Sequence, residues 1–70
     1  MTMNNFGKRL KELRIEKKLS QKELANIIST NNSSVCDWEC GRSEPNFDAL
    51  IKLCKFFDVT ADYLLGLSDY

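Results

Sequence analysis

The chain has no histidine, only three glycines and one proline, and equal numbers of acidic and basic side chains. Without histidine, a glycine-rich phosphate loop or a convincing pair of carboxylates, the sequence offers no catalytic constellation, and we do not expect an enzyme. The three cysteines have no C-x-x-C spacing, which argues against a zinc site and a disulfide framework. We therefore expect no metal, no cofactor and no small-molecule ligand.

Long hydrophobic runs are also missing from the chain. No apolar stretch approaches the roughly 18 residues needed to cross a bilayer, and the N-terminus lacks the pattern of a signal peptide. At 70 residues, of which 43% are hydrophobic, the chain can bury one modest core. We expect residues 1–70 to form a single domain that is cytoplasmic and makes no membrane contact.

The net charge of zero conceals an asymmetry between the two halves of the chain. Residues 1–35 carry seven basic and three acidic side chains, whereas residues 36–70 carry three basic and seven acidic ones. Such a dipolar molecule can still present a positive face to phosphate. For the first helix taken alone, a solvated face explains the lysines equally well.

Two short helices separated by a polar turn are predicted between residues 20 and 41. Ser20 and Glu23 have the S-x-x-E spacing of a capping box, so the first of these helices begins near Gln21. Its apolar face is formed by Leu24, Ala25 and Ile28. The polar run at residues 29–32 interrupts this pattern, as expected of a turn.

The second helix restarts near Asn32 and ends at Gly41, because glycine adopts a left-handed cap without steric cost. Val35 and Trp38 lie three residues apart on its inner face. The residues predicted to point largely the other way are Asn32, Ser33, Cys36 and Asp37. Two short helices of this kind fit the helix-turn-helix geometry.

Three more helices are predicted around this pair. The first follows an Asn4 or Asn5 cap, the fourth follows an Asn46 cap after the loop at Pro45, and the fifth runs from Ala61 to Leu65. The apolar stripe of the first helix is Phe6, Leu10 and Leu13, with Leu19 closing over the same side, and that of the fourth is Phe47, Leu50, Ile51, Cys54 and Phe57. We expect an all-α fold, a compact bundle of five short helices without strands.

The motif residues resemble those of a known family. The order Ser20-Gln21-x-Glu23-Leu24-Ala25, then Val35-x-x-Trp38-Glu39-x-Gly41-Arg42, then Pro45, resembles the Cro and phage-repressor type of helix-turn-helix protein, the XRE family. The ending Val59-Thr60-x-Asp62-Tyr63-Leu64-Leu65-Gly66 is similar to the closing segment of the same domain. The resemblance covers about residues 5–66 and implies a lambda repressor-like DNA-binding domain with its helix-turn-helix at about residues 20–41.

The resemblance also implies roles for individual residues. In this family the first motif helix crosses the DNA backbone, and the second, here about residues 32–39, lies in the major groove. Gln21 matches a phosphate-contacting position, where the positive helix N-terminus assists, and Lys22 adds charge beside it. Arg42 and Asn46 flank the following loop and are expected to contact phosphate, which fixes the register without reading sequence.

Base reading is expected from the start and middle of the second motif helix. Asn31 or Asn32 could pair with the N6 and N7 atoms of adenine, although Asn31 serves equally well as the helix cap. Ser33 and Asp37 match base-reading positions of the family one turn apart, and Asp37 could accept a hydrogen bond from cytosine N4. A carboxylate in the groove is repelled by phosphates unless it meets a donor, so we expect modest affinity with a strong salt dependence.

Other positions have structural interpretations. Arg14 and Glu39 match positions that commonly form a partly buried ion pair between the first and third helices of the family. Ser29 stands where the family usually has glycine, so either the turn differs or this residue bears left-handed strain. Cys54 is interpreted as a small core residue. Cys36 and Cys40, one helical turn apart, leave a redox role open.

Two functions of different classes follow from these patterns. The first is a prokaryotic or phage transcriptional regulator, a repressor in the leading hypothesis, that binds a pseudo-palindromic operator of double-stranded DNA as a homodimer. The second is a protein-interaction module such as an antitoxin or anti-repressor, motivated by Asp37, Glu39 and Glu44. Apolar residues left over for a dimer surface are Phe56, Tyr63, Leu65, Leu67 and Tyr70.

Overall fold

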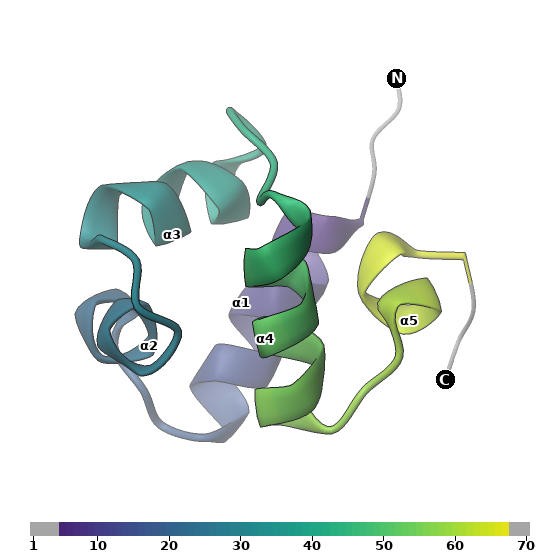
Figure 1. Ribbon diagram of the computed structural model, residues 1–70, viewed down its shortest axis with the longest axis horizontal. Coiled ribbons are helices and arrows are strands. Elements are labelled where there is room, and N and C mark those ends of the chain that lie inside the picture. Colours follow the sequence, from purple (N-terminus) through teal and green to yellow (C-terminus); the bar gives the residue numbers. More distant parts are fainter. Residues whose placement is uncertain (1–4, 68–70) are drawn as a thin grey trace.

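The computed structural model describes residues 5–67, and that part of the chain contains five α-helices and no strand (Figure 1). The helices are α1 (Phe6–Glu16), α2 (Gln21–Ile27), α3 (Asn32–Cys40), α4 (Phe47–Phe57) and α5 (Ala61–Leu65). The predicted all-α bundle is confirmed. Within the described residues, none of these helices has the length and apolar character required to span a bilayer.

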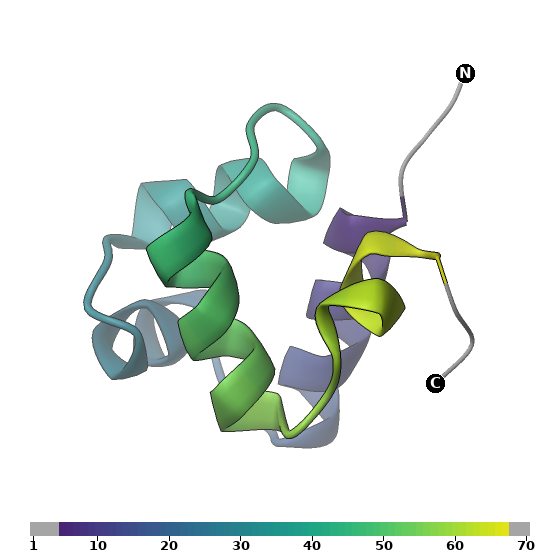
Figure 2. The same cartoon turned by 45° about the vertical axis from the view of Figure 1, so that its right-hand side comes forward.

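The helices are arranged so that α3 lies against both α2 and α1, while α5 contacts α1 and α4 (Figures 1 and 2). In Figure 1, α2 and α3 form the left side of the molecule and α4 passes in front of α1. The motif pair therefore occupies one side of the bundle, and α3 has an outer side that no other described helix covers in either view.

Each helix contributes one fully buried aliphatic side chain to a shared core. These residues are Leu10, Leu24, Val35, Leu53 and Leu64, each with 0% of its surface exposed. Phe6, Ala25, Ile28, Trp38 and Phe57 complete the cluster. Burying one large apolar side chain stabilises a fold by about 1.5–3 kcal/mol, so even the shortest helices, α2 and α5, are held by this common core.

Four of the five helices begin at a side chain that caps a backbone N–H. Ser20 and Glu23 form the predicted capping box, and the predicted caps Asn46 and Thr60 accept hydrogen bonds from Ala49 and Tyr63. Asn5, one of the two predicted caps of α1, occupies the cap position, but its side chain makes no capping bond. Its ψ of 7° departs from the extended backbone from which a capping side chain normally reaches the first turn. Asn4 lies outside the described residues.

Left-handed backbone conformations follow the ends of α2, α3 and α5. Gly41 closes α3 at φ 80°, as predicted, and Gly66 closes α5 at φ 82°. Ser29 has φ 63° in the turn between α2 and α3, so the left-handed strain considered for this non-glycine residue is present. The N–H of Thr30 then donates to the carbonyl of Ala25 at 2.8 Å, which fixes the turn.

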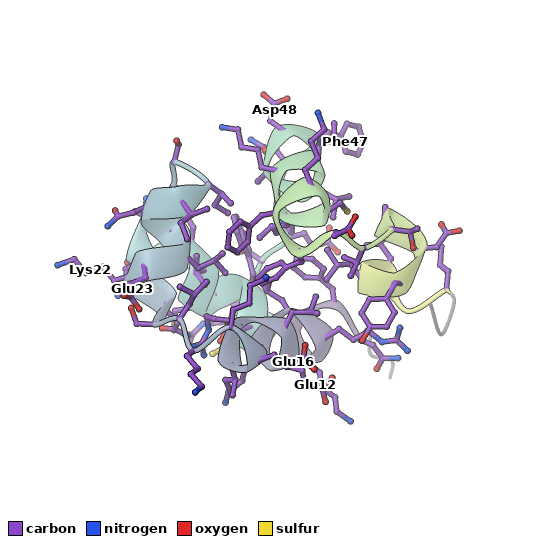
Figure 3. All side chains as sticks on the ribbon, turned by 90° about the horizontal axis from the view of Figure 1, so that it is seen from below. Glu12, Glu16, Lys22, Glu23, Phe47 and Asp48 are labelled. Atoms are coloured by element: carbon purple, nitrogen blue, oxygen red, sulfur yellow. The ribbon has the colours of Figure 1, made fainter. Side chains whose placement is uncertain are left out.

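The predicted apolar stripe of α4 is partly wrong. Phe47 is 83% exposed and Ile51 is 51% exposed, whereas Leu53, absent from the expected stripe, is fully buried. Figure 3 shows Phe47 and Asp48 at the start of α4, projecting away from the bundle. The segment carries two overlapping apolar stripes, and the one defined by Leu50, Leu53 and Phe57 meets the core.

Candidate nucleic-acid interface

The outer face of α3 is polar because its apolar residues are used in the core. Val35 and Trp38, three residues apart, are 0% and 6% exposed. This orientation leaves Asn32 and Ser33 exposed, with Cys36 and Asp37 half-buried on the same side. Asn32, Ser33 and Asp37 are three of the predicted base-reading residues, and all of them lie at least partly in solvent.

The start of α3 separates the roles of its two asparagines. The side-chain oxygen of Asn31 accepts a hydrogen bond from the N–H of Ser34 at 2.8 Å, so this residue caps the helix. Bidentate pairing with adenine requires both the oxygen and the nitrogen of the amide. Asn32 is exposed, and we therefore favour it over Asn31 as the adenine-reading residue.

An ion pair ties α1 to α3 beneath this face. The Nε atom of Arg14 donates to one carboxylate oxygen of Glu39 at 2.7 Å and its Nη2 atom donates to the other at 3.1 Å. The side chains of Arg14 and Glu39 are only 12% and 3% exposed. The hydrogen bond with Glu39 raises the pKa of the Arg14 guanidinium, against the lowering effect of burial. Arg14 also donates to the carbonyl of Leu19 at 2.7 Å, which anchors the chain just before α2.

Gln21 joins the same network at the start of α2. Its Nε2 atom donates to Glu39 at 3.1 Å, a bond that sequence reasoning did not anticipate. A glutamine amide has two N–H groups, so the second can still donate to a phosphate. The neighbouring Lys22 is exposed, and Figure 3 shows it at the outer edge of α2. The buried carboxylate thus orients one of the predicted phosphate-contacting residues.

Arg42 folds back along α3 instead of extending into the following loop. The left-handed Gly41 lets the Arg42 N–H donate to the Asp37 carbonyl at 2.9 Å. The Nε atom of Arg42 then donates to the Asp37 carboxylate at 3.2 Å, and its Nη2 atom lies 3.9 Å from the sulfur of Cys36. The electrostatic interaction with Cys40, followed by that with Asp37, raises the pKa of the Arg42 guanidinium.

This pairing was also missed from the sequence, although a signal for it exists. When a glycine ends a helix, the residue after it donates its backbone N–H to the carbonyl five positions earlier. Asp37 and Arg42 have that spacing around Gly41. The structure therefore brings together two residues to which the sequence assigned separate roles in the groove and on phosphate. Asn46, the other loop-flanking residue, is exposed and caps α4.

The cysteines differ in exposure. Cys40 is exposed and Cys36 is half-buried, while Cys54 packs against the core and is half-buried. Among residues 5–67, no group of three or more histidine, cysteine or acidic side chains is placed to hold a metal ion.

We expect the thiol of Cys40 to react faster than that of Cys54 with iodoacetamide in the folded protein. Burial raises the pKa of the Cys54 thiol, which lowers its thiolate fraction, and only the thiolate is nucleophilic. Timed alkylation followed by peptide mass spectrometry checks the order. Alkylation in denaturant is the control, because the difference should vanish there. Equal rates in the folded chain would contradict the placement of Cys54.

A short helix packed across a second helix, which presents a polar face to solvent, defines the helix-turn-helix class of domain. The comparisons agree with this geometry. The chain belongs to the helix-turn-helix domain family, whose sequence pattern it matches over residues 7–69. Its similarity to known regulators shows that it is a helix-turn-helix domain of the XRE or phage-repressor type.

Two curated relatives and one solved structure illustrate the likeness. The HTH-type transcriptional regulator ImmR of Bacillus subtilis is 39% identical over 62 residues, which is 89% of this chain and 49% of ImmR. The HTH-type transcriptional activator BcrR of Enterococcus faecalis is 38% identical over 61 residues, which is 87% of this chain and 30% of BcrR. The chain thus spans half or less of these relatives.

The solved structure is the P22 c2 repressor protein in complex with a synthetic operator. It superposes with a TM-score of 0.85 at 30% identity, covering 90% of this chain and 96% of the repressor chain. The predicted lambda repressor-like fold is confirmed by this likeness.

Proposed function

We propose that this chain is the sequence-specific DNA-binding domain of a prokaryotic or phage transcriptional regulator, with α3 in the major groove. The observation that carries the proposal is the polar outer face of α3, which Val35 and Trp38 orient by their burial. The relatives named as transcriptional regulators and the repressor solved with operator support it. The function is one of binding, and residues 1–70 act in it as one domain in the cytoplasm.

Repression is the regulatory outcome we favour for the chain. The P22 c2 repressor has the same fold over nearly its whole solved length. BcrR is named as an activator, and the chain covers only 30% of it. Because α2 and α3 can position either a repressor or an activator on DNA, a separate measurement is needed. A reporter gene placed behind the selected operator shows whether the chain represses or activates transcription.

The alternative protein-interaction function loses much of its motivation in the structure. Of the three acidic residues behind it, Glu39 is buried against Arg14 and Asp37 is paired with Arg42. Only Glu44 remains both exposed and without a role in the geometry described above. A partner that recognises an acidic surface would therefore find one free carboxylate in this region instead of three.

Selection from a random duplex library at low salt tests the proposal. We expect an enriched sequence with related half-sites whose centres lie about one helical turn apart. Binding to the enriched duplex should weaken steeply with added salt, since each neutralised phosphate releases bound counterions. If the bound duplexes show no enriched sequence, the result would contradict the proposal and favour a protein partner.

Lys22→Ala should weaken binding to all duplexes to a similar extent. Its exposed ammonium at the edge of α2 is proposed to meet phosphate, so its loss should reduce the slope of log affinity against log salt by about one. A gel-shift series at several salt concentrations measures the slope. Lys52→Ala, an exposed lysine on α4, is the control and should leave the slope unchanged. An unaltered slope for Lys22→Ala would remove this residue from the interface.

A homodimer is part of the proposal, because two related half-sites call for two copies of α3. Leu65 and Leu67 are 41% and 75% exposed, which supports the predicted apolar surface at this end of the chain. Two other members are less available, because Phe56 and Tyr63 are half-buried beneath Lys17 and Arg9. Tyr70 lies outside the described residues. Sedimentation with and without the selected duplex measures the stoichiometry.

A further inference from the structure

The pairing of Asp37 with Arg42 places a hydrogen-bond acceptor and a donor side by side on the polar face of α3. The guanidinium reaches both Asp37, at 3.2 Å, and the sulfur of Cys36, at 3.9 Å. It therefore lies over the same stretch of α3 that is proposed to enter the major groove.

The backbone, more than the exposed ion pair, brings these two side chains together. Gly41 reverses the chain at φ 80°, and the Arg42 N–H bonds to the Asp37 carbonyl at 2.9 Å. The side chains are 66% and 43% exposed, and exposed pairs of this kind contribute little to stability. Their proximity is thus available for recognition, and either side chain can be changed without unfolding the domain.

Both groups keep unused hydrogen-bonding capacity when they are paired. A guanidinium has five N–H groups, and the bond to Asp37 uses one of them. The carboxylate has two oxygens, and the same bond uses one. In the major groove, cytosine presents the N4 donor and its paired guanine presents the O6 and N7 acceptors. One carboxylate acceptor beside guanidinium donors is the complement of that edge.

We propose that Asp37 and Arg42 act as one recognition unit that selects a C·G base pair in each half-site. Asp37 accepts from cytosine N4, and Arg42 donates to the guanine while neutralising the carboxylate against the surrounding phosphates. The inference rests on the proposed function and adds to it a coupling between the two residues. It also gives Arg42 a role in specificity in place of the phosphate contact expected from the sequence.

The test uses duplexes that carry each of the four base pairs at every position of the selected site. The unaltered chain should prefer C·G at one position of each half-site by at least about fivefold. Asp37→Asn and Arg42→Ala should each abolish that preference at this same position, and the double variant should lose no further discrimination there. Arg42→Lys keeps the charge but not the planar fork, so it should retain general affinity and lose the preference.

Three outcomes would contradict the proposal that Asp37 and Arg42 act as one recognition unit. In the first, Arg42→Ala weakens binding to all duplexes equally and leaves the preference intact, which is the behaviour of a phosphate contact. In the second, the two single variants alter different positions. In the third, no C·G position responds to either variant although the unaltered chain enriches a sequence; the proposed function then stands alone. If the unaltered chain enriches no sequence, the proposed function itself fails. Thermal melting followed by circular dichroism should show both single variants folded.

Discussion

Gly7→Ala should destabilise the domain by at least about 2 kcal/mol, even though alanine is the better helix former. Gly7 lies in α1 where that helix approaches the end of α3. A Cβ atom at this position would lie 2.6 Å from the Trp38 carbonyl oxygen and 2.7 Å from that of Glu39. Both neighbours are backbone atoms, so α1 and α3 would have to separate to admit a methyl group.

Thermal unfolding of Gly7→Ala distinguishes the two effects, because packing and helix propensity change the stability in opposite directions. Packing predicts that the melting temperature falls by roughly 8–16 °C, because 1 kcal/mol corresponds to about 4–8 °C in a domain of this size. Helix propensity alone predicts a gain of about 1 kcal/mol. Lys8→Ala, next in α1 and exposed, is the matched control and should change stability by no more than about 0.5 kcal/mol. A Gly7→Ala variant as stable as Lys8→Ala would show that the two helices are not in close contact.

Glu39→Ala should cost about 3–5 kcal/mol, because it leaves the charge of Arg14 in a largely buried position without its carboxylate. The variant also removes the acceptor of Gln21, so the hydrogen bonds from the Glu39 carboxylate to both α1 and α2 are lost together. Urea denaturation measures the free energy of unfolding. In a domain of 70 residues a loss of this size is a large share of the total stability.

Three further variants distinguish loss of the ion pair from a general effect of removing an acidic side chain. Glu12→Ala removes an exposed carboxylate of α1, which Figure 3 shows away from the bundle interior, and should shift stability by no more than about 0.5 kcal/mol. Arg14→Ala should be about as damaging as Glu39→Ala, and the double variant should cost less than the sum of the two. Strict additivity, or a small loss for Glu39→Ala, would refute a buried pair.

Local sequence signals predicted the elements of the fold well. The Ser20 capping box, the caps at Asn31, Asn46 and Thr60, and the left-handed Gly41 all depend on interactions within a few residues, and the structure contains each of them. The failure at Asn5 arises because its backbone has a ψ of 7°, which its residue type does not determine.

Interactions between helices were harder to predict. The apolar residues of α4 form two stripes, and only the position of α4 on the core selects Leu53 over Phe47 and Ile51. The need for glycine at Gly7 arises from the backbone of α3, more than thirty residues away in sequence. Neither feature follows from periodicity, which reports the width of an apolar face but not the element that covers it.

In the candidate interface, the surface positions of the residues were predictable but the contacts between them were not. The predicted residues of α2 and α3 lie at or near the surface, as the burial of Leu24, Val35 and Trp38 requires. Their couplings were not foreseen, because the bond from Gln21 to Glu39 joins different helices and the Asp37 and Arg42 pair depends on a chain reversal. The DNA contacts assigned to these residues stay predictions until duplex is added.

Amide chemical shifts of the ¹⁵N-labelled chain, recorded as the selected duplex is added, report which residues contact DNA. The placement of α3 in the major groove predicts the largest shifts at residues 31–37 and further shifts at Gln21, Lys22 and Arg42. A separate set of shifts is expected in α5, at the end of the chain where the two copies are proposed to meet. Large shifts confined to α1 and α4, with residues 31–37 unchanged at saturation, would contradict the placement of α3 in the major groove.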